Sequence, residues 1–179
     1  IAIPDSVTSI GNYAFSGCSG LTDVYYTGDL AGWMDIEFGG SYANPKYYAD
    51  NLYIDGELLE GEIVIPDGET KINAYTFYNC SGMTSITIPD SVTSIGNYAF
   101  RGCSDLTDVY YTGDLAGWMD IEFSSSYANP MYYADNLYID SELLEGDIVI
   151  PDGVTKINAY AFYDCSGLTS VIIPDSVTS

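Results

Sequence analysis

Four cysteines are the most reactive side chains in the sequence, and each follows a phenylalanine by three residues. They are Cys18, Cys80, Cys103 and Cys165. A metal-binding or redox-active thiol needs partners at ligand spacing, and the chain contains no CxxC motif and no histidine. Because a free cysteine is small and readily buried, we expect the four thiols to form an inert column in the core. A disulfide between Cys80 and Cys103, or a metal site, are the alternatives.

The acidic residues supply many carboxylates in no catalytic arrangement. One aspartate follows the proline of each Ile-Pro-Asp motif: Asp5, Asp67, Asp90, Asp152 and Asp175. These could form a cation-attracting column, but we favour turn acids bonded to the backbone, because no calcium-binding loop or repeat is present. Asp35 with Glu37 offers paired carboxylates, but the sequence indicates no cleft, no nucleophile elbow and no phosphate loop. We therefore expect no enzyme activity, no cofactor and no metal.

Aromatic residues are the remaining candidates for chemistry. The stretch YYTGDLAGWMDIEF occurs at residues 25–38 and again at 110–123, and it contains both tryptophans. Leu30, Trp33 and Met34 follow the i, i+3, i+4 spacing of a helix face, which favours a core position for the tryptophan over a partly exposed one.

Tyrosine is a better candidate for contact, being large, fairly rigid and amphipathic. Strand alternation in VYYTG places the first tyrosine outward and the second inward, as with Tyr25 and Tyr26. The motifs NPKYYADNLY and NPMYYADNLY bring further tyrosine pairs beside loops. The predicted binding residues are Tyr25, Tyr47, Tyr48, Tyr110, Tyr132 and Tyr133.

Internal repetition must position these residues, because it organises the whole chain. Residues 1–85 align without a gap with residues 86–170 and differ at only 12 positions. Two of the exchanges are expected on the surface: Ser16 to Arg101, and Lys46 to Met131. We expect a single solenoid domain over residues 1–179, made of two blocks and the start of a third, and cut from a longer array.

Within each block, a 23-residue unit recurs, as in IPDGVTKINAYAFYDCSGLTSVI at residues 150–172. Its apolar spacing fits no continuous helix. It predicts short strands at LTSVII and VTKI and one helical turn at NAYAFYDC, with Pro-Asp turns between the strands. One unit cannot bury its apolar side, but stacked units can. The predicted fold is an α/β leucine-rich-repeat solenoid of short strands and short helical turns, elongated or gently curved.

A longer segment of 39 residues separates these units in each block, roughly residues 26–64 and 111–149. Asp29 is an expected N-cap for a short amphipathic helix, and the runs around Asp55-Gly56 predict a hairpin. The equivalent Asp140-Ser141 is a weaker hairpin signal. The pattern leaves open whether this segment continues the stack or bulges from it.

The 23-residue unit resembles the BspA-like leucine-rich repeats of bacterial surface proteins. IPDSVTSIGNYAFSGCSGLTDV at residues 3–24 has their spaced IP, V, IG, AF, C and L positions. The pattern recurs at 65–86, 88–109 and 150–171 and begins again at 173. Glu69 replaces a valine and Thr76 an alanine, so we expect looser packing near Glu69. The resemblance implies an extracellular or bacterial cell-surface location and a role in adhesion.

The charge restricts the choice of partner. The chain has 26 acidic and 4 basic residues, a formal net charge of −22, which repels phosphate backbones and anionic lipids. No apolar run approaches the roughly 18 residues of a membrane span. We expect a non-catalytic protein-binding or adhesion module that contacts proteins or glycans of a host or neighbouring cell surface. A carbohydrate-binding module with exposed aromatics and a passive spacer are the alternatives.

Overall fold

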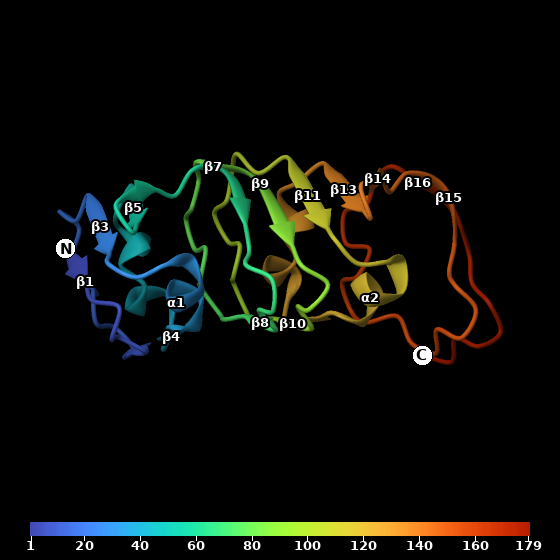
Figure 1. Ribbon diagram of the computed structural model, residues 1–179, viewed down its shortest axis with the longest axis horizontal. Helices are drawn as coiled ribbons and strands as arrows, with labels where there is room; N and C mark the ends of the chain where they lie inside the picture. The colour runs from blue at the N-terminus through green and yellow to red at the C-terminus, as the bar shows by residue number, and fades with distance from the viewer.

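Short parallel strands, one from each turn of the chain, form the main face of the molecule. The computed structural model describes all residues 1–179, and the chain advances along the long axis from the N-terminus to the C-terminus (Figure 1). The strands of this main face are β1 (Ala2–Ile3), β3 (Asp23–Tyr26), β5 (Asn51–Ile54), β7 (Gly61–Val64), β9 (Met83–Ile88), β11 (Asp108–Tyr111), β13 (Asn136–Ile139), β15 (Gly146–Val149) and β16 (Leu168–Ile172).

A second, narrower face is built from two-residue strands farther along each turn. They are β2 (Ser9–Ile10), β4 (Glu37–Phe38), β8 (Lys71–Ile72), β10 (Ser94–Ile95) and β12 (Glu122–Phe123). The short helices are α1 (Leu30–Asp35), α2 (Leu115–Asp120), and the 3-10 turns η1 (Ser41–Ala43), η2 (Pro45–Tyr47), η3 (Ser126–Ala128) and η4 (Pro130–Tyr132). The structure therefore confirms the predicted solenoid of short strands and short helical turns.

The strand register confirms that one turn of the solenoid is a 23-residue unit. Ile63 pairs with Ile86 and Ile86 with Val109, each in parallel and each 23 residues apart. The predicted strand at LTSVII appears as β16, but VTKI at residues 154–157 is not a strand. NAYAFYDC forms hydrogen-bonded turns rather than a helix.

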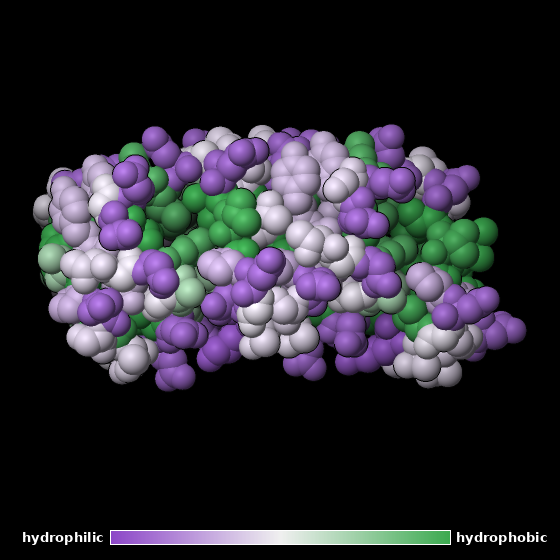
Figure 2. All heavy atoms as spheres, viewed as in Figure 1, coloured by the Kyte–Doolittle hydropathy of each residue, from purple (hydrophilic) through white to green (hydrophobic).

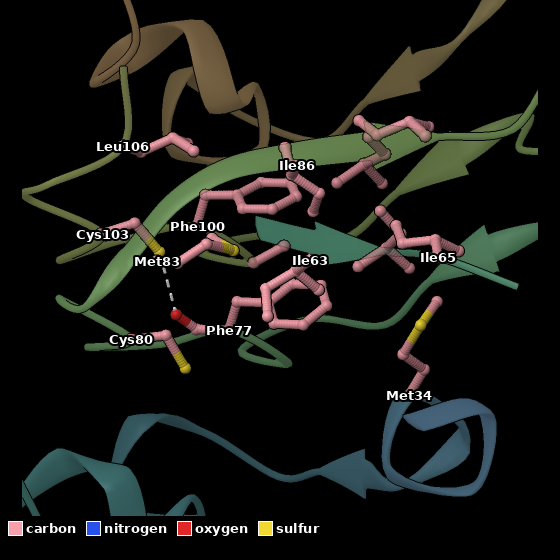
Figure 3. Packing of buried hydrophobic residues seen from close by; sticks show 14 of the residues in the cluster. Met34, Ile63, Ile65, Phe77, Cys80, Met83, Ile86, Phe100, Cys103 and Leu106 are labelled. Carbon is pink, nitrogen blue, oxygen red and sulfur yellow. Dashed lines mark hydrogen bonds between the residues drawn. The ribbon is translucent and has the colours of Figure 1, made fainter. Parts of the chain in front are cut away.

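The core is a column of equivalent side chains from successive coils. Phe77 and Phe100 are fully buried, and their rings stack with centroids 5.4 Å apart (Figure 3). Cys80 and Cys103 are buried free thiols beside them, and the Cys103 thiol donates to the Phe77 carbonyl at 3.1 Å. Burial raises the pKa of Cys80 to about 11, so this thiol is protonated at neutral pH. The outer two cysteines are less enclosed: Cys18 is exposed and Cys165 half-buried.

The 39-residue segment continues the stack and then interrupts it. β3 pairs in parallel with β5, with Val24 opposite Leu52, so this coil takes 28 residues instead of 23. β5 then turns back into β6 (Glu57–Leu58) as the predicted hairpin, and β13 does the same with β14 (Glu142–Leu143). No strand pairs with the outer edge of β6 or β14. The main face is consequently divided into sheets of four, five and two strands.

Side chains carry the stack across each interruption. Asp29 caps α1, as predicted, by accepting a hydrogen bond from Gly32 N at 2.9 Å. Trp33 is thereby fully buried against the coil that begins with β7. Its indole N–H donates to the Thr76 carbonyl of that coil at 3.0 Å. Asn44 donates to the Tyr75 carbonyl in the same coil at 2.7 Å.

The second block repeats this junction. Trp118 donates to the Ala161 carbonyl at 2.7 Å, and Asn129 donates to the Tyr160 carbonyl at 2.8 Å. Both tryptophans are therefore buried, and each joins two coils that no strand ladder connects.

The exchange of Lys46 for Met131 lies in the core, so its predicted place on the surface was wrong. Lys46 is 3% exposed and Met131 is 1% exposed. The Lys46 ammonium donates to the Asp50 carbonyl at 2.6 Å, but a buried charge with one neutral partner remains costly. The sequence predicted a surface position because lysine is rarely buried. Only the packing of η2 in the structure shows that Lys46 lies in the core.

Replacing Lys46 by the methionine of the other block is expected to stabilise the protein. Lys46→Met should raise the free energy of unfolding by about 1–3 kcal/mol, because it removes the desolvated charge and keeps the volume. Urea unfolding at neutral pH measures the change. The matched variant Met131→Lys should lower stability, and a neutral effect of both exchanges would contradict this account.

The two hairpins give a second matched pair. Asp55 and Gly56 have φ of 49° and 84°, and Asp140 and Ser141 have φ of 48° and 69°. A left-handed conformation disfavours serine, so Ser141→Gly should stabilise by about 1 kcal/mol and Gly56→Ser should destabilise by a similar amount. Thermal unfolding of both variants tests the sign, and Gly56→Ser without effect would contradict the expectation.

Candidate binding surfaces

The main face carries the same aromatic pair in each block. Tyr25 projects outward, 45% exposed, and stacks on Tyr53 with ring centroids 4.7 Å apart and planes 13° apart. Tyr110 and Tyr138 repeat this arrangement at 4.6 Å and 16°. The pairs form because β3–β5 and β11–β13 place the tyrosines directly opposite each other in register. The strand alternation predicted from VYYTG is confirmed, with Tyr26 buried behind them.

A carboxylate–amide pair lies two residues before each tyrosine pair on the same strands. Asn51 donates to Asp23 at 2.8 Å, and Asn136 donates to Asp108 at 2.9 Å. The hydrogen bonds from Asn51 and from Thr22 lower the pKa of Asp23, so it stays ionised well below neutral pH. Each block therefore presents stacked rings beside a carboxylate held by an asparagine.

Exposed aliphatic side chains also lie on the main face. Val64 is 63% exposed and Val149 61% exposed, both on main-face strands. Figure 2 shows apolar surface between rows of hydrophilic residues. The main face is thus a mixed surface of rings, aliphatic groups and acids.

The turns that follow the second face carry a different aromatic array, which we call the tyrosine row. Its rings contact one another without a break along the successive coils, with centroids 4.3–6.2 Å apart. The members are Tyr13, Tyr42, Tyr47, Tyr48, Tyr75, Tyr78, Tyr98, Tyr127, Tyr132, Tyr133, Tyr160 and Tyr163. The sequence pattern did not predict the row, because its contacts join tyrosines of different motifs across coils of 23 and 28 residues.

Four members of the row hold a strained backbone. Tyr13, Tyr75, Tyr98 and Tyr160 have φ of 61°, 65°, 57° and 67°. A bulky residue rarely adopts this left-handed conformation, which favours glycine or asparagine. The same strain recurs at the same position of four repeats, so each copy of this turn carries a cost in stability.

The six predicted binding tyrosines fall on two separate surfaces. Tyr25 and Tyr110 lie on the main face. The other four belong to the tyrosine row: Tyr47, Tyr48, Tyr132 and Tyr133. The Tyr48 hydroxyl accepts from Gly17 N at 3.0 Å and the Tyr133 hydroxyl from Gly102 N at 2.9 Å, so these two also support the turns.

None of the five aspartates of the Ile-Pro-Asp motifs accepts a backbone hydrogen bond through its carboxylate, so the prediction of turn acids bonded to the backbone was wrong, and two of them use their own N–H instead. Asp5 N donates to the Thr27 hydroxyl, and Asp90 N donates to the Thr112 hydroxyl, each at 3.1 Å. No group of three or more His, Cys, Asp or Glu side chains is arranged to hold a metal ion. None of the helices has the length and apolar character needed to cross a membrane.

Two hollows of the surface are lined mainly by polar groups. The largest, of about 620 Å³, lies between α2 and the following corner and is lined mainly by polar groups, including Asp114, Asp120 and Lys156. Another, of about 290 Å³, lies beside Lys46 and Tyr47. Small-molecule sites are predominantly apolar concavities, so the broad aromatic faces are better candidates for recognition.

The stacked short strands and helical turns define a leucine-rich-repeat solenoid. A family model described as the BspA type leucine rich repeat region matches residues 1–40, 58–146 and 134–179, in six copies. These ranges cover most of the chain, which therefore belongs to this family.

Two solved structures are similar to the chain. A leucine rich cell surface protein from Faecalibacterium prausnitzii A2-165 is 25% identical over 98% of this chain and 55% of its own, with a TM-score of 0.44. A leucine-rich repeat protein from Bacteroides ovatus ATCC 8483 is 22% identical over 99% of this chain and 55% of its own, with a TM-score of 0.46. The chain spans about half the length of these two proteins. No curated protein matches it.

The packed tyrosines predict alkaline destabilisation. Burial and the nearby Asp90, Asp114 and Asp120 carboxylates raise the pKa of Tyr111 to about 12. The hydrogen bond to Tyr127 and partial desolvation likewise raise the pKa of Tyr132 to about 12. The pKa of a tyrosine in the unfolded chain is about 10. The folded state therefore holds these protons more tightly, and its stability should be complete below about pH 10 and fall toward about pH 12.

Urea unfolding between about pH 9 and pH 12 measures this loss. The variant Tyr111→Phe keeps the ring and removes one titrating hydroxyl, so its stability should fall less steeply. Identical pH profiles for the variant and the unmodified protein would contradict the assignment to Tyr111.

Proposed function

We propose that this chain is a non-catalytic protein-binding module with an adhesive role, displayed outside the cell or on a bacterial surface. The observation that supports it best is the repeated main-face site: a stacked tyrosine pair beside a hydrogen-bonded Asp–Asn pair, once in each block. The location rests on membership of the family.

The chemistry of the site suits a protein partner. Stacked tyrosines are large and rigid, so they lose little conformational entropy on binding. Val64 and Val149, exposed on other strands of the main face, supply apolar area, and the carboxylates of Asp23 and Asp108 favour a partner with basic residues. Two equal sites on one rigid solenoid bind a repetitive partner with an avidity above that of either site alone.

Carbohydrate binding is the second candidate. The exposed face of the Tyr25–Tyr53 pair offers a stacking platform, and the Asp23–Asn51 pair offers hydrogen-bonding groups next to it. The burial of Trp33 and Trp118 removes the strongest stacking residues from any sugar site. The protein-binding hypothesis is therefore preferred, and the spacer hypothesis predicts no ligand at all.

A pull-down from host and bacterial surface proteins at two salt concentrations, with a glycan array in parallel, separates these functions. The double variant Tyr25→Ser, Tyr110→Ser should lose the captured protein. Each single variant should retain weakened binding, reduced by about 10-fold or more if both sites act together.

Thr8→Ala and Thr93→Ala, at exposed positions beside the second face, are matched control changes and should bind normally. Selective glycan binding lost in the double variant would replace protein with carbohydrate as the ligand. Capture unchanged by the double variant would remove the main face as the contact surface.

A further inference from the structure

The only arginine of the chain lies on the tyrosine row. The Arg101 guanidinium carbon is 5.2 Å from the centroid of the Tyr98 ring, 5.5 Å from that of Tyr127 and 6.0 Å from that of Tyr78. These three tyrosines come from three successive coils. A guanidinium within about 6 Å of a ring centroid gains a cation–π attraction, and arginine does so more often than lysine.

The contact of Arg101 with rings is informative because acidic side chains are abundant in this chain. The chain has 26 acidic side chains, yet Arg101 forms no ion pair and contacts rings instead. Arg101 is exposed, so burial does not force it onto the row. The geometry of the row itself therefore accommodates a planar cation.

The first block has the same ring pair without its own arginine. Tyr13 and Tyr42 occupy the positions of Tyr98 and Tyr127, with centroids 5.9 Å apart against 5.4 Å in the second block. Ser16 stands where the second block has Arg101. The ring pair is thus present in the first block, and no arginine of the chain covers it.

We propose that Tyr13 and Tyr42 bind an arginine side chain from a basic segment of a partner protein, in the way that Arg101 covers the equivalent rings. This deepens the proposed function by naming the partner's chemistry, and it rests on that function being protein binding. The net charge of −22 attracts such a segment and repels nucleic acid and anionic membranes.

The left-handed backbone of Tyr13 is consistent with this role. Its φ of 61° matches the 57° of Tyr98, so both rings are directed by the same strained turn. Strain retained at an equivalent position is expected where the direction of a side chain matters for function. The open site is therefore formed before any partner arrives.

The natural difference between the blocks supplies the test. Binding of an oligo-arginine peptide is measured by titration calorimetry with the unmodified chain, with length-matched oligo-lysine and glycine-serine peptides for comparison. Ser16→Arg should close the open site and weaken oligo-arginine binding by about 3-fold or more, whereas Arg101→Ser should strengthen it.

Charge-matched variants separate the site from the overall field. Ser6→Arg adds the same charge at an exposed corner, and Lys156→Ser removes one at another exposed position. Each should change the Kd less than its partner variant does. Tyr13→Phe should retain binding and Tyr13→Ser should lose it, and circular dichroism checks that both are folded.

Three results would overturn the proposal: no oligo-arginine binding, equal effects of Ser16→Arg and Ser6→Arg, or no preference for arginine over lysine together with normal binding by Tyr13→Ser. The main-face variant Tyr25→Ser, Tyr110→Ser should bind the peptide normally. Failure of the main-face pull-down would therefore count against the proposed function alone, and failure here against the arginine site alone.

Discussion

The hydrogen bond from a buried indole to the next coil holds this solenoid together where its sheets end. A parallel strand ladder normally joins neighbouring coils, but the β5–β6 and β13–β14 hairpins close that ladder in each block. Trp33 and Trp118 cross the gap, each donating to a carbonyl 43 residues farther along the chain. An unsatisfied indole in this dry interior would be costly, so the bond also fixes how the two coils meet.

This indole hydrogen bond explains why the 39-residue segment keeps its place in the stack. The tryptophan must face the following coil, which requires Asp29 to cap α1 and the ring of Tyr26 to pack against Trp33. A side chain at Gly32 would place its Cβ 2.6 Å from the Tyr26 hydroxyl, so glycine is required there. The stretch that carries both tryptophans is therefore scaffold, and recognition falls to the tyrosines around it.

Much of the fold followed from the sequence, because local signals and repetition agree. The 23-residue register, the Asp29 cap, the Asp55-Gly56 hairpin and the burial of Tyr26 beneath Tyr25 were all predicted and are confirmed. The Cys80 and Cys103 thiols pack inside as expected, but Cys18 is exposed and Cys165 only half-buried, so the expected column of four buried thiols is confirmed for two of them.

What the sequence could not predict depends on contacts between coils. The burial of Lys46, the carbonyl partners of the tryptophans and the tyrosine row all require knowing which turn lies against which. One position of the 23-residue unit is tyrosine in all four copies: Tyr13, Tyr75, Tyr98 and Tyr160. This recurrence is the signal from which the tyrosine row could have been suspected.

The near-identity of the two blocks has a consequence for how such a molecule changes in evolution. Residues 1–85 and 86–170 contain equivalent hairpins and equivalent indole bonds. Duplication or loss of one block by unequal recombination would create only junctions between coils that the chain already contains. The reach of the rod and the number of its sites can thus vary in whole steps, while every residue keeps the neighbours to which it is already fitted.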